Sequence, residues 1–413
     1  MLIVYRILIN FTLLVSPLIL IFRLFYKKED LRRFKEKYCL FSQRKRKGKL
    51  VWFHGASVGE ISSIIPLIGK LEKDSSIKQI LVTSNTLSSS KIIQRYKFKK
   101  LTHQFFPLDN NYLSEKFLDY WKPSSSFFID SEIWPNTIIN LKKRNIPIVL
   151  LNARITKRTF NRWMLFSKFA NQIFNQLDLC LSSNNESKKF LRNLGAKKIK
   201  LIGNLKFSQF ENDKIFINKG LKKFISSKKT WCASSTHNSE EIFCGLIHKD
   251  LKKKYKNLLT IIIPRHVERA SKIEKDLKVL NLKTHFHEPE SKIQKDTDIY
   301  IVNSYGKTKS FYKYCRNIFL GGSIVKHGGQ NPLEATRFGC NIIHGPNISN
   351  FKDIYKFLKK EKISIQVNNQ KQMISAINKF FKTKSNSNNM QRKFYIIGQK
   401  ILKLTYNEIK SYL

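Results

Sequence analysis

Acidic residues are scarce in this chain of 413 residues: aspartate and glutamate total 29 against 77 lysines and arginines. The resulting formal net charge of +48 predicts an anionic partner, namely nucleic acid, membrane phospholipid or a phosphorylated substrate. Alanine is also rare while lysine, asparagine and isoleucine are abundant, a skew that genome base composition alone can produce. The charge is therefore a guide to the environment of the protein and does not identify its chemistry.

Cysteines are few, widely scattered and without a C-x-x-C pair, which argues against a structural zinc site and a disulfide framework. A reducing, cytosolic location is favoured. The aromatic and basic interleaving of a known RNA-binding module is also lacking, so no nucleic-acid partner is expected. The six cysteines are Cys39, Cys180, Cys232, Cys244, Cys315 and Cys340.

The one uncharged stretch near the N-terminus runs from Ile7 to Phe22, between two arginines. It falls just short of the ~20 residues that span a bilayer, although snorkelling arginines extend the reach. No small-residue cleavage site follows it, which disfavours a cleaved signal peptide. Residues 1–26 are therefore predicted to be a membrane anchor. The basic residues that follow predict that the body of the protein stays in the cytoplasm.

Residues 27–49 are predicted to be a basic juxtamembrane linker. Its cluster Arg44–Lys47 is either solvated or held against anionic lipid. Beyond it, short β-rich runs alternate with helical patterns, as parallel α/β units require. The predicted strands are Leu50–His54, Gln79–Ser84, Ser126–Asp130, Pro147–Leu151, Leu177–Leu181 and Ile199–Ile202, then Thr230–Ser234, Leu258–Ile263, Ile299–Val302, Asn317–Leu320 and Asn341–His344.

This alternation predicts an α/β protein of two doubly wound, Rossmann-like domains that face a cleft, because ligands bind at the carboxyl ends of parallel strands. The predicted order after the anchor and linker is a first domain at 50–207, a connection at 208–229, a second domain at 230–381, a loop at Lys382–Asn389 and a C-terminal helix at 390–413.

The segment HGASVGE, His54 to Glu60, lies where the first strand should end and a helix begin. Its small residues would let a ligand approach the backbone, and Glu60 would stand at the carboxyl edge of the sheet. The same letters satisfy the S-x-x-E capping box, in which Glu60 merely accepts from the amide of the cap residue. Both interpretations stay open at this point.

Two further motifs of the first domain carry charge at strand ends. IDSEIWPN places Asp130 and Glu132 directly after a buried strand, where carboxylates are costly to bury without purpose. Trp134 and Pro135 fit core and helix-start roles. In GNLKF, Lys206 follows the last predicted strand and could neutralise a phosphate or carboxylate, but one lysine among so many is weak evidence.

The second domain contributes turns of the kind that bind phosphate. SSTH (234–237) and Pro264-Arg265-His266 each follow a strand, and for Arg265 anion binding is favoured over a surface salt bridge. In GGSIVKHGGQNPLEA (321–335) the glycine pairs indicate close backbone approach, Asn331 should cap a helix, and Pro332 should be its first residue. Glu334 could either join that cap or accept from ribose hydroxyls.

In this linear order the motifs resemble those of the transferases that add Kdo (3-deoxy-D-manno-octulosonic acid) to lipid A, which are GT-B glycosyltransferases of family thirty. The similarity runs from the N-terminal anchor to about Asp353 and includes LLNARIT (150–156) and GPNISNF (345–351). The resemblance implies that Glu60 is the general base and that Asp130 and Lys206 stabilise the transition state. The implied contacts to CMP are Pro264, Arg265, Tyr305, Gly306, Lys307, Asn331, Pro332, Leu333 and Glu334.

The chain departs from the family pattern at two places. Asp130 stands where the family usually has glutamate, and residues 303–307 read NSYGK where the family has a segment like DTMGE. The first change keeps the charge on a shorter arm. The second replaces a carboxylate by a cation, which makes CMP specificity less secure.

By resemblance, the expected reaction is inverting, metal-independent transfer of Kdo from CMP-Kdo to a tetraacylated lipid A precursor at the cytoplasmic face of the inner membrane. No cofactor and no obligatory protein partner are expected. The alternatives are another GT-B glycosyltransferase acting on a membrane lipid and, from a different class, a basic membrane-associated nucleic-acid-binding protein.

Overall fold

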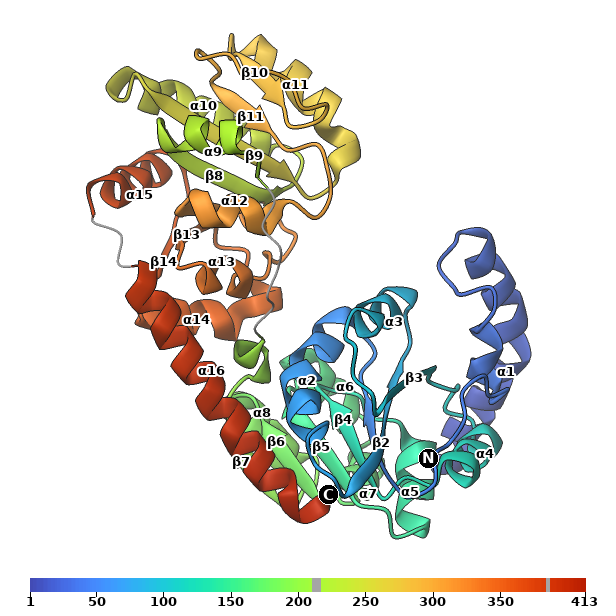
Figure 1. Ribbon diagram of the computed structural model, residues 1–413. Helices are drawn as coiled ribbons and strands as arrows, with labels where there is room; N and C mark the ends of the chain where they lie inside the picture. The colour runs from blue at the N-terminus through green and yellow to red at the C-terminus, as the bar shows by residue number, and fades with distance from the viewer. Residues whose placement is uncertain (210–216, 384–386) are drawn as a thin grey trace. The chain divides into compact units, whose positions relative to one another are not determined.

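The computed structural model describes residues 1–209, 217–383 and 387–413. The chain forms two compact units, Met1–Phe210 with Ile397–Leu413, and Glu211–Ile396. Each unit is built on one seven-stranded sheet covered by helices (Figure 1). The α/β class and the two doubly wound sheets predicted from the sequence are confirmed. Parts of the predicted connection at 208–229 and of the predicted loop at Lys382–Asn389 lie outside the described residues.

The sheet of the first unit is parallel, in the order β3-β2-β1-β4-β5-β6-β7. The run from Leu50 to His54 is buried throughout, as expected of a parallel strand covered on both faces. The strand order reverses between β1 and β4, so the carboxyl ends of these two strands form the switch point at which ligands bind. The strands are β1 Lys49–His54, β2 Ile77–Ser84, β3 Leu101–Phe105, β4 Ser125–Ile129, β5 Ile148–Ala153, β6 Leu179–Ser182 and β7 Ile199–Leu201.

Several helices of the first unit begin at a polar side chain that accepts from a backbone amide of the first turn, which satisfies a donor with no partner inside the helix. These caps are Ser57, Thr86, Asn110, Thr156 and Asn184. The helices are α1 Leu2–Phe25, α2 Val58–Leu71, α3 Leu87–Gln94, α4 Asn111–Trp121, α5 Pro135–Lys143, α6 Lys157–Met164, α7 Ser167–Phe174 and α8 Asn185–Asn193, with the short turns η1 Phe34–Tyr38 and η2 Leu205–Ser208.

The sheet of the second unit is also parallel, in the order β10-β11-β9-β8-β12-β13-β14. Its switch point lies between β8 and β12. The strands are β8 Lys229–Thr236, β9 Leu258–Pro264, β10 Thr284–Phe286, β11 Ile299–Ile301, β12 Asn317–Leu320, β13 Asn341–His344 and β14 Ser364–Gln366. The helices are α9 Lys219–Ser226, α10 Glu240–Lys254, α11 Ala270–Val279, α12 Thr308–Tyr314, α13 Leu333–Arg337, α14 Lys352–Lys360 and α15 Gln370–Lys382, with the short turns η3 Val267–Arg269 and η4 Ser349–Phe351.

The long C-terminal helix α16, Ser387–Ile409, begins in the second unit, and its second half belongs to the first. It is followed by the short turn η5 Lys410–Tyr412. Gly398 permits this packing, since a Cβ there would lie 2.4 Å from the carbonyl oxygen of Phe207 in η2. Further along, Lys200 Nζ lies 2.6 Å from Glu408 Oε2. The helix therefore supports the turn that carries Lys206.

Three predicted segments contain structure that the sequence pattern did not indicate. The segment 208–229 carries α9, whose Leu221 and Ile225 are buried against the second sheet. The linker 27–49 contains η1, where the carboxylate of Glu36 is buried and accepts from Arg33 and from the amide of Phe105. The final helix begins at Ser387 and not near residue 390. Helix α1, Leu2–Phe25, has the length and the apolar composition that a membrane-crossing helix needs.

Candidate active site

Glu60 lies in the first turn of α2, directly after β1, and a variant of the predicted capping box is present, in which the Glu60 carboxylate accepts from the amide of Ala56, one residue before the cap. Ser57 caps the helix, and its Oγ donates to Glu60 Oε1 over 2.7 Å. The amide of Ala56 donates to Glu60 Oε2, also over 2.7 Å. The capping role is therefore real, and it aims the carboxylate at the carboxyl edge of the sheet without excluding a catalytic role.

The protonation of Glu60 is unusual for a glutamate. Burial, assisted by the negative charges of Glu132 and Asp130, raises the pKa of Glu60 to about 7, against the lowering effect of the bonds from Ser57 and Ala56. A carboxyl group with such a pKa exchanges its proton near neutral pH, as a general base should. A helix cap alone does not need this property.

Asp130 and Lys206 form an ion pair at the same edge, with Nζ 2.8 Å from Oδ2. Asp130 follows β4 with a left-handed backbone (φ 57°), which turns its side chain out of the strand direction. Asn152, at the end of β5, donates its side-chain amide to Asp130 and accepts from the amide of Leu205 over 2.8 Å. Asn152 therefore fixes both partners of the ion pair.

The structure adds a buried histidine, His54, to which sequence analysis gave no role. His54 is fully buried, with Nε2 3.2 Å from Glu132 Oε2. Trp134 Nε1 lies 3.0 Å from the same carboxylate oxygen and 3.2 Å from His54 Nε2. Trp134, expected to be a core residue, thus orients the second acidic residue of the motif. The sequence feature that could have indicated a role for His54 is its position directly after the apolar residues Leu50–Phe53.

The other side of the His54 ring determines where its hydrogen lies. Thr83 Oγ1 is 3.3 Å from the carbonyl of Phe53, to which it donates, and it accepts from Trp52 Nε1 over 2.9 Å. Its remaining lone pair faces His54 Nδ1 at 2.9 Å, so Nδ1 carries a hydrogen. Nε2 then accepts from Trp134 Nε1, which also donates to Glu132, so the indole links the buried ring to the acidic edge.

In the second unit, a buried carboxylate shapes the turns predicted to bind phosphate. Glu240, at the start of α10, accepts from the amides of Gly322 (2.7 Å), Ser323 (3.2 Å) and Ile324 (3.1 Å). It also accepts from the amide of His237 over 3.0 Å. The turns that follow β8 and β12 are therefore held together by one side chain, which sequence analysis overlooked.

The glycine-rich run after β12 is as tightly packed as its composition predicts. A Cβ on Gly321 would lie 2.5 Å from the carbonyl oxygen of Ser235, and one on Gly345 would lie 2.2 Å from that of Ser323. The helix starts one residue later than predicted: α13 begins at Leu333, and Pro332, predicted to be its first residue, takes the cap position. Asn331, predicted to be the cap, lies one residue further out, although its Oδ1 accepts from the amide of Leu333 over 3.1 Å. Glu334 lies 3.6 Å from Lys309, so it has a cation partner that the capping interpretation did not foresee.

The remaining residues predicted to contact the nucleotide lie after β9 and β11, two neighbouring strands of the same sheet. Arg265 is exposed, directly after Pro264 at the end of β9. Tyr305 donates to Glu268 over 2.8 Å, and Gly306 has a left-handed backbone (φ 80°). Lys307 Nζ lies 3.7 Å from Glu288, so this chain supplies a carboxylate partner for the cation that departs from the family pattern.

Three histidines gather beside these turns. The rings of His237 and His327 are stacked with centroids 4.1 Å apart, and His266 is 6.1 Å from His237. Burial and the neighbouring cationic or protonatable groups lower the pKa of His237 to about 4, so this ring is neutral at pH 7. The permanent positive charge in this region is Arg265, in the turn Pro264-Arg265-His266.

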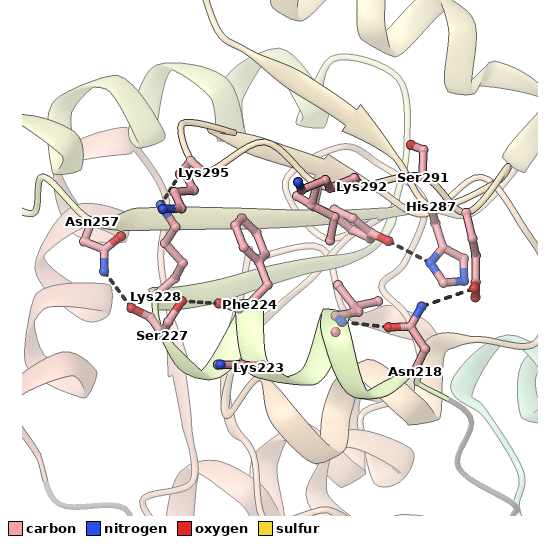
Figure 2. Close-up of a pocket in the computed structure, with 15 residues that line it drawn as sticks. Asn218, Lys223, Phe224, Ser227, Lys228, Asn257, His287, Ser291, Lys292 and Lys295 are labelled. Carbon is pink, nitrogen blue, oxygen red and sulfur yellow. Dashed lines mark hydrogen bonds between the residues drawn. The ribbon is translucent and has the colours of Figure 1, made fainter.

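A cavity of about 640 Å³ lies elsewhere in the second unit, between α9 and the segment before β11. Figure 2 shows Phe224 pointing from α9 toward it, with Lys228 and Lys292 nearby. It is lined by none of the predicted site residues. Within the described parts of the chain, no three His, Cys, Asp or Glu side chains come together in a way that could hold a metal ion. The six cysteines are buried and free.

Comparison with known proteins identifies the family. A family model described as 3-deoxy-D-manno-octulosonic-acid transferase (kdotransferase) matches residues 32–209. The 3-deoxy-D-manno-octulosonic acid transferase of Rickettsia bellii is 34% identical over 380 residues, which cover 89% of this chain and 88% of the relative. That of Haemophilus influenzae is 30% identical over 322 residues, 77% of this chain and 75% of the relative.

A solved structure of UDP-GlcNAc 2-epimerase from Neisseria meningitidis covers 88% of this chain and 100% of its own, with a TM-score of 0.59 and 12% identity. At that identity the likeness concerns the fold alone. The sequence relatives go further, because they share both units and carry one activity in their names. The chain therefore belongs to the family of 3-deoxy-D-manno-octulosonic acid transferases, the Kdo transferases of lipopolysaccharide biosynthesis, and is a glycosyltransferase.

Proposed function

We propose that this protein transfers Kdo from CMP-Kdo to a tetraacylated lipid A precursor, with inversion and without a metal ion, at the cytoplasmic face of the inner membrane. The observation that carries the proposal is Glu60, a carboxylate fixed by two hydrogen bonds at the switch point of the first sheet with a pKa of about 7. Membership of the Kdo transferase family supports the sugar.

In the proposed reaction the acceptor hydroxyl attacks the anomeric carbon of Kdo. Glu60 takes the hydroxyl proton as the new carbon–oxygen bond forms, and the bond to the CMP phosphate breaks, so CMP leaves with the electron pair. The fixed Asp130–Lys206 pair supplies a charged environment that needs no reorganisation during the reaction. Burial, with the nearby carboxylates of Glu132 and Asp130, holds the pKa of Glu60 up.

The second unit is proposed to hold CMP. The guanidinium of Arg265, exposed at the end of β9, provides donors for an anionic group beside the turns after β8 and β12, which Glu240 holds together. The charge on the departing phosphate is then stabilised by arginine and lysine in place of a metal. Tyr305–Lys307 contribute through the backbone, because Tyr305 and Lys307 side chains already engage Glu268 and Glu288.

The test is turnover by the purified full-length protein with lipid acceptor and CMP-Kdo, compared with UDP- and ADP-sugars. Mass spectrometry of the product counts the Kdo units, and EDTA tests the need for a metal. We expect transfer from CMP-Kdo alone, unaffected by EDTA. Preferential use of a UDP- or ADP-sugar would identify a different GT-B transferase, and salt-sensitive RNA binding without turnover would favour the nucleic-acid alternative.

A further inference from the structure

The helix α1 has two unlike faces. On one face, residues spaced three to four apart are partly or fully buried along the whole length of the helix. A helix that projected freely from a domain would not have such a buried face. Leu2, Tyr5 and Leu13 pack against the core cluster that includes Phe169 and Ile173. The inner face comprises Leu2, Tyr5, Arg6, Ile9, Leu13, Ser16, Leu20 and Arg23.

The N-terminal half of α1 is fixed to the folded unit by polar contacts. Tyr5 donates its hydroxyl to Asp109 Oδ2 over 2.7 Å. Asp109 is buried and also accepts from the amides of Asn136 (3.0 Å) and Thr137 (2.9 Å), at the start of α5. Arg6 donates to the side chains of Asn136 over 3.0 Å and of Asn111 over 2.7 Å. Pulling this end away would leave a buried carboxylate short of a donor.

The C-terminal half is tied to the chain that follows it. Ser16 Oγ lies 2.8 Å from the hydroxyl of Tyr38. Glu29 is buried and pairs with Arg23 over 2.6 Å and with Lys37 over 2.8 Å. Both ends of the helix are therefore held against one side of the same folded unit. A helix that crossed a bilayer would have its two ends on opposite sides, so the contacts of Tyr5 and Arg6 with the folded unit would be broken.

The outer face of α1 is an exposed apolar stripe. Its members follow one another at spacings of four, four, three, four, four and three residues, which keeps them on one side of a helix. They span about 33 Å at 1.5 Å per residue. The stripe comprises Ile3, Ile7, Phe11, Leu14, Leu18, Phe22 and Phe25, exposed between 62% and 81%. A continuous apolar surface of this length needs a covering partner.

The surroundings of the stripe indicate what covers it. At its C-terminal end the exposed Lys27, Lys28 and Arg32 stand beside exposed Tyr26 and Leu31. Such a mixture of cations, an amphipathic aromatic ring and apolar side chains suits the boundary between anionic headgroups and acyl chains.

A second exposed apolar turn, Met164–Phe166, lies close to the docked end of α1, since Phe169 of α7 is 6.1 Å from the ring of Tyr5. It is flanked by the exposed cations Arg162 and Lys168. The combination of apolar and basic side chains therefore recurs at both ends of the helix, and it complements an anionic lipid surface.

We propose that α1 lies along the surface of one leaflet, with the stripe among the acyl chains and the inner face on the folded unit. The chain is thus attached to the membrane without crossing it, and the N-terminus stays on the same side as both units. This attachment is independent of the proposed reaction. The covering partner is an anionic lipid bilayer, and a second copy of the chain is the competing occupant.

The side of the membrane on which the N-terminus lies distinguishes a surface helix from a helix that spans the bilayer. The full chain with an N-terminal protease-cleavable tag is expressed in a Gram-negative host, and protease is added to spheroplasts or to inverted inner-membrane vesicles. We expect cleavage in the inverted vesicles and protection in spheroplasts. Cleavage from the outer side of intact spheroplasts would overturn the proposal, because the helix would then cross the bilayer.

Substitutions test the two faces separately, with binding of the purified protein to vesicles of phosphatidylethanolamine and phosphatidylglycerol as the readout. Leu18→Lys should weaken binding at least tenfold, while Val279→Lys, at an exposed apolar residue of the second unit, should not. Tyr5→Phe should lower the melting temperature and leave vesicle binding within twofold. Unchanged binding by Leu18→Lys would refute the lipid assignment. A concentration-dependent dimer that dissociates in Leu18→Lys, without vesicle binding by the parent, would identify the second copy as the partner.

Discussion

Lys206 Nζ and Asp130 Oδ2 lie 2.8 Å apart, although 76 residues separate the two in the sequence. The lysine comes from η2 and the aspartate from the turn after β4. Because each charge is largely shielded from water, removing one leaves the other without its partner. The effects of Lys206→Met and Asp130→Asn on turnover should therefore not add.

A double-mutant cycle measures this coupling. We expect an interaction energy of about 0.5–3 kcal/mol in kcat/KM, with the double variant less impaired than the sum of the two single variants. The same cycle on urea unfolding separates stability from catalysis. Strict additivity in turnover would show that the two residues act independently.

Glu60→Gln separates the cap from the base. The glutamine oxygen can accept from Ala56, and the Ser57 hydroxyl can rotate to accept from the glutamine amide, so the box survives. Turnover should fall about 10²–10⁴-fold while the melting temperature at pH 8 is kept or rises, since a raised carboxyl pKa means that the folded state disfavours the charged form.

The pH profile gives a second readout for Glu60. Turnover of the parent should rise with pH through about 7, as the Glu60 carboxyl loses its proton, and the variant should lack this limb. Near-normal turnover by Glu60→Gln would reduce Glu60 to a helix cap, and Asp130 would become the first candidate for the base.

Arg265→Ala should weaken CMP binding about ten- to a hundredfold, because a charge-assisted hydrogen bond contributes roughly 1.5–3 kcal/mol. Calorimetry with CMP measures the change directly. Lys272→Ala, which removes an exposed cation from neighbouring α11, is the matched control and should bind CMP like the parent. Equal affinities for all three proteins would place the nucleotide elsewhere.

Two glycine-to-alanine substitutions should have opposite effects. A Cβ at Gly321 meets backbone and the buried Glu240 carboxylate within 2.7 Å, so Gly321→Ala should destabilise the second unit or prevent its folding. A Cβ at Gly59 meets nothing within 4 Å, and Gly59→Ala should stabilise α2 by about 0.5–1 kcal/mol. If Gly59→Ala is stable but impairs turnover, a ligand occupies that space; a destabilised Gly59→Ala would contradict the packing.

Acid should weaken the first unit through His103. Burial, with the Arg33 guanidinium beside it, lowers the pKa of His103 to about 3, whereas an unfolded histidine titrates near 6.5. The unfolded state therefore binds more protons between these values, and stability falls as pH drops through this window. From pH 7 to 5 the loss from His103 is about 2 kcal/mol.

Urea unfolding of the parent and of His103→Gln at several pH values isolates this contribution. The free energy of unfolding of the variant should depend correspondingly less on pH than that of the parent. Parallel curves for parent and His103→Gln would mean that the imidazole titrates alike in both states.

Strands with continuous apolar runs were predicted within one or two residues, because burial on both faces leaves a strong signal. β3 was missed, since its sequence LTHQF alternates polar residues that are buried by specific bonds, such as His103 to Ser84. β10 and β14 were missed because three residues at the edges of a sheet carry no periodicity. A local sequence pattern cannot show that a buried polar residue has a hydrogen-bond partner on another strand.

In the candidate site, too, residues with a local sequence signal were predicted and residues with distant partners were missed. Glu60, Asp130 and Lys206 were found as charges at strand ends, where burial is costly. His54, Asn152 and Glu240 were not given roles, because their importance lies in partners far away in the sequence. Glu240 looks like an ordinary acidic residue in the first turn of a helix until the loop of Gly322 is seen to wrap its oxygens.

The packing of α16 on η2 also constrains the synthesis of the protein. Residues up to Lys206 leave the ribosome well before Gly398 and the helix around it are translated, so the nascent first unit exposes the apolar surface that Ile401 and Leu402 later bury. The first unit is therefore completed only when residues 397–413 have been translated, after the whole of the second unit, and the turn that carries Lys206 gains its support at that point.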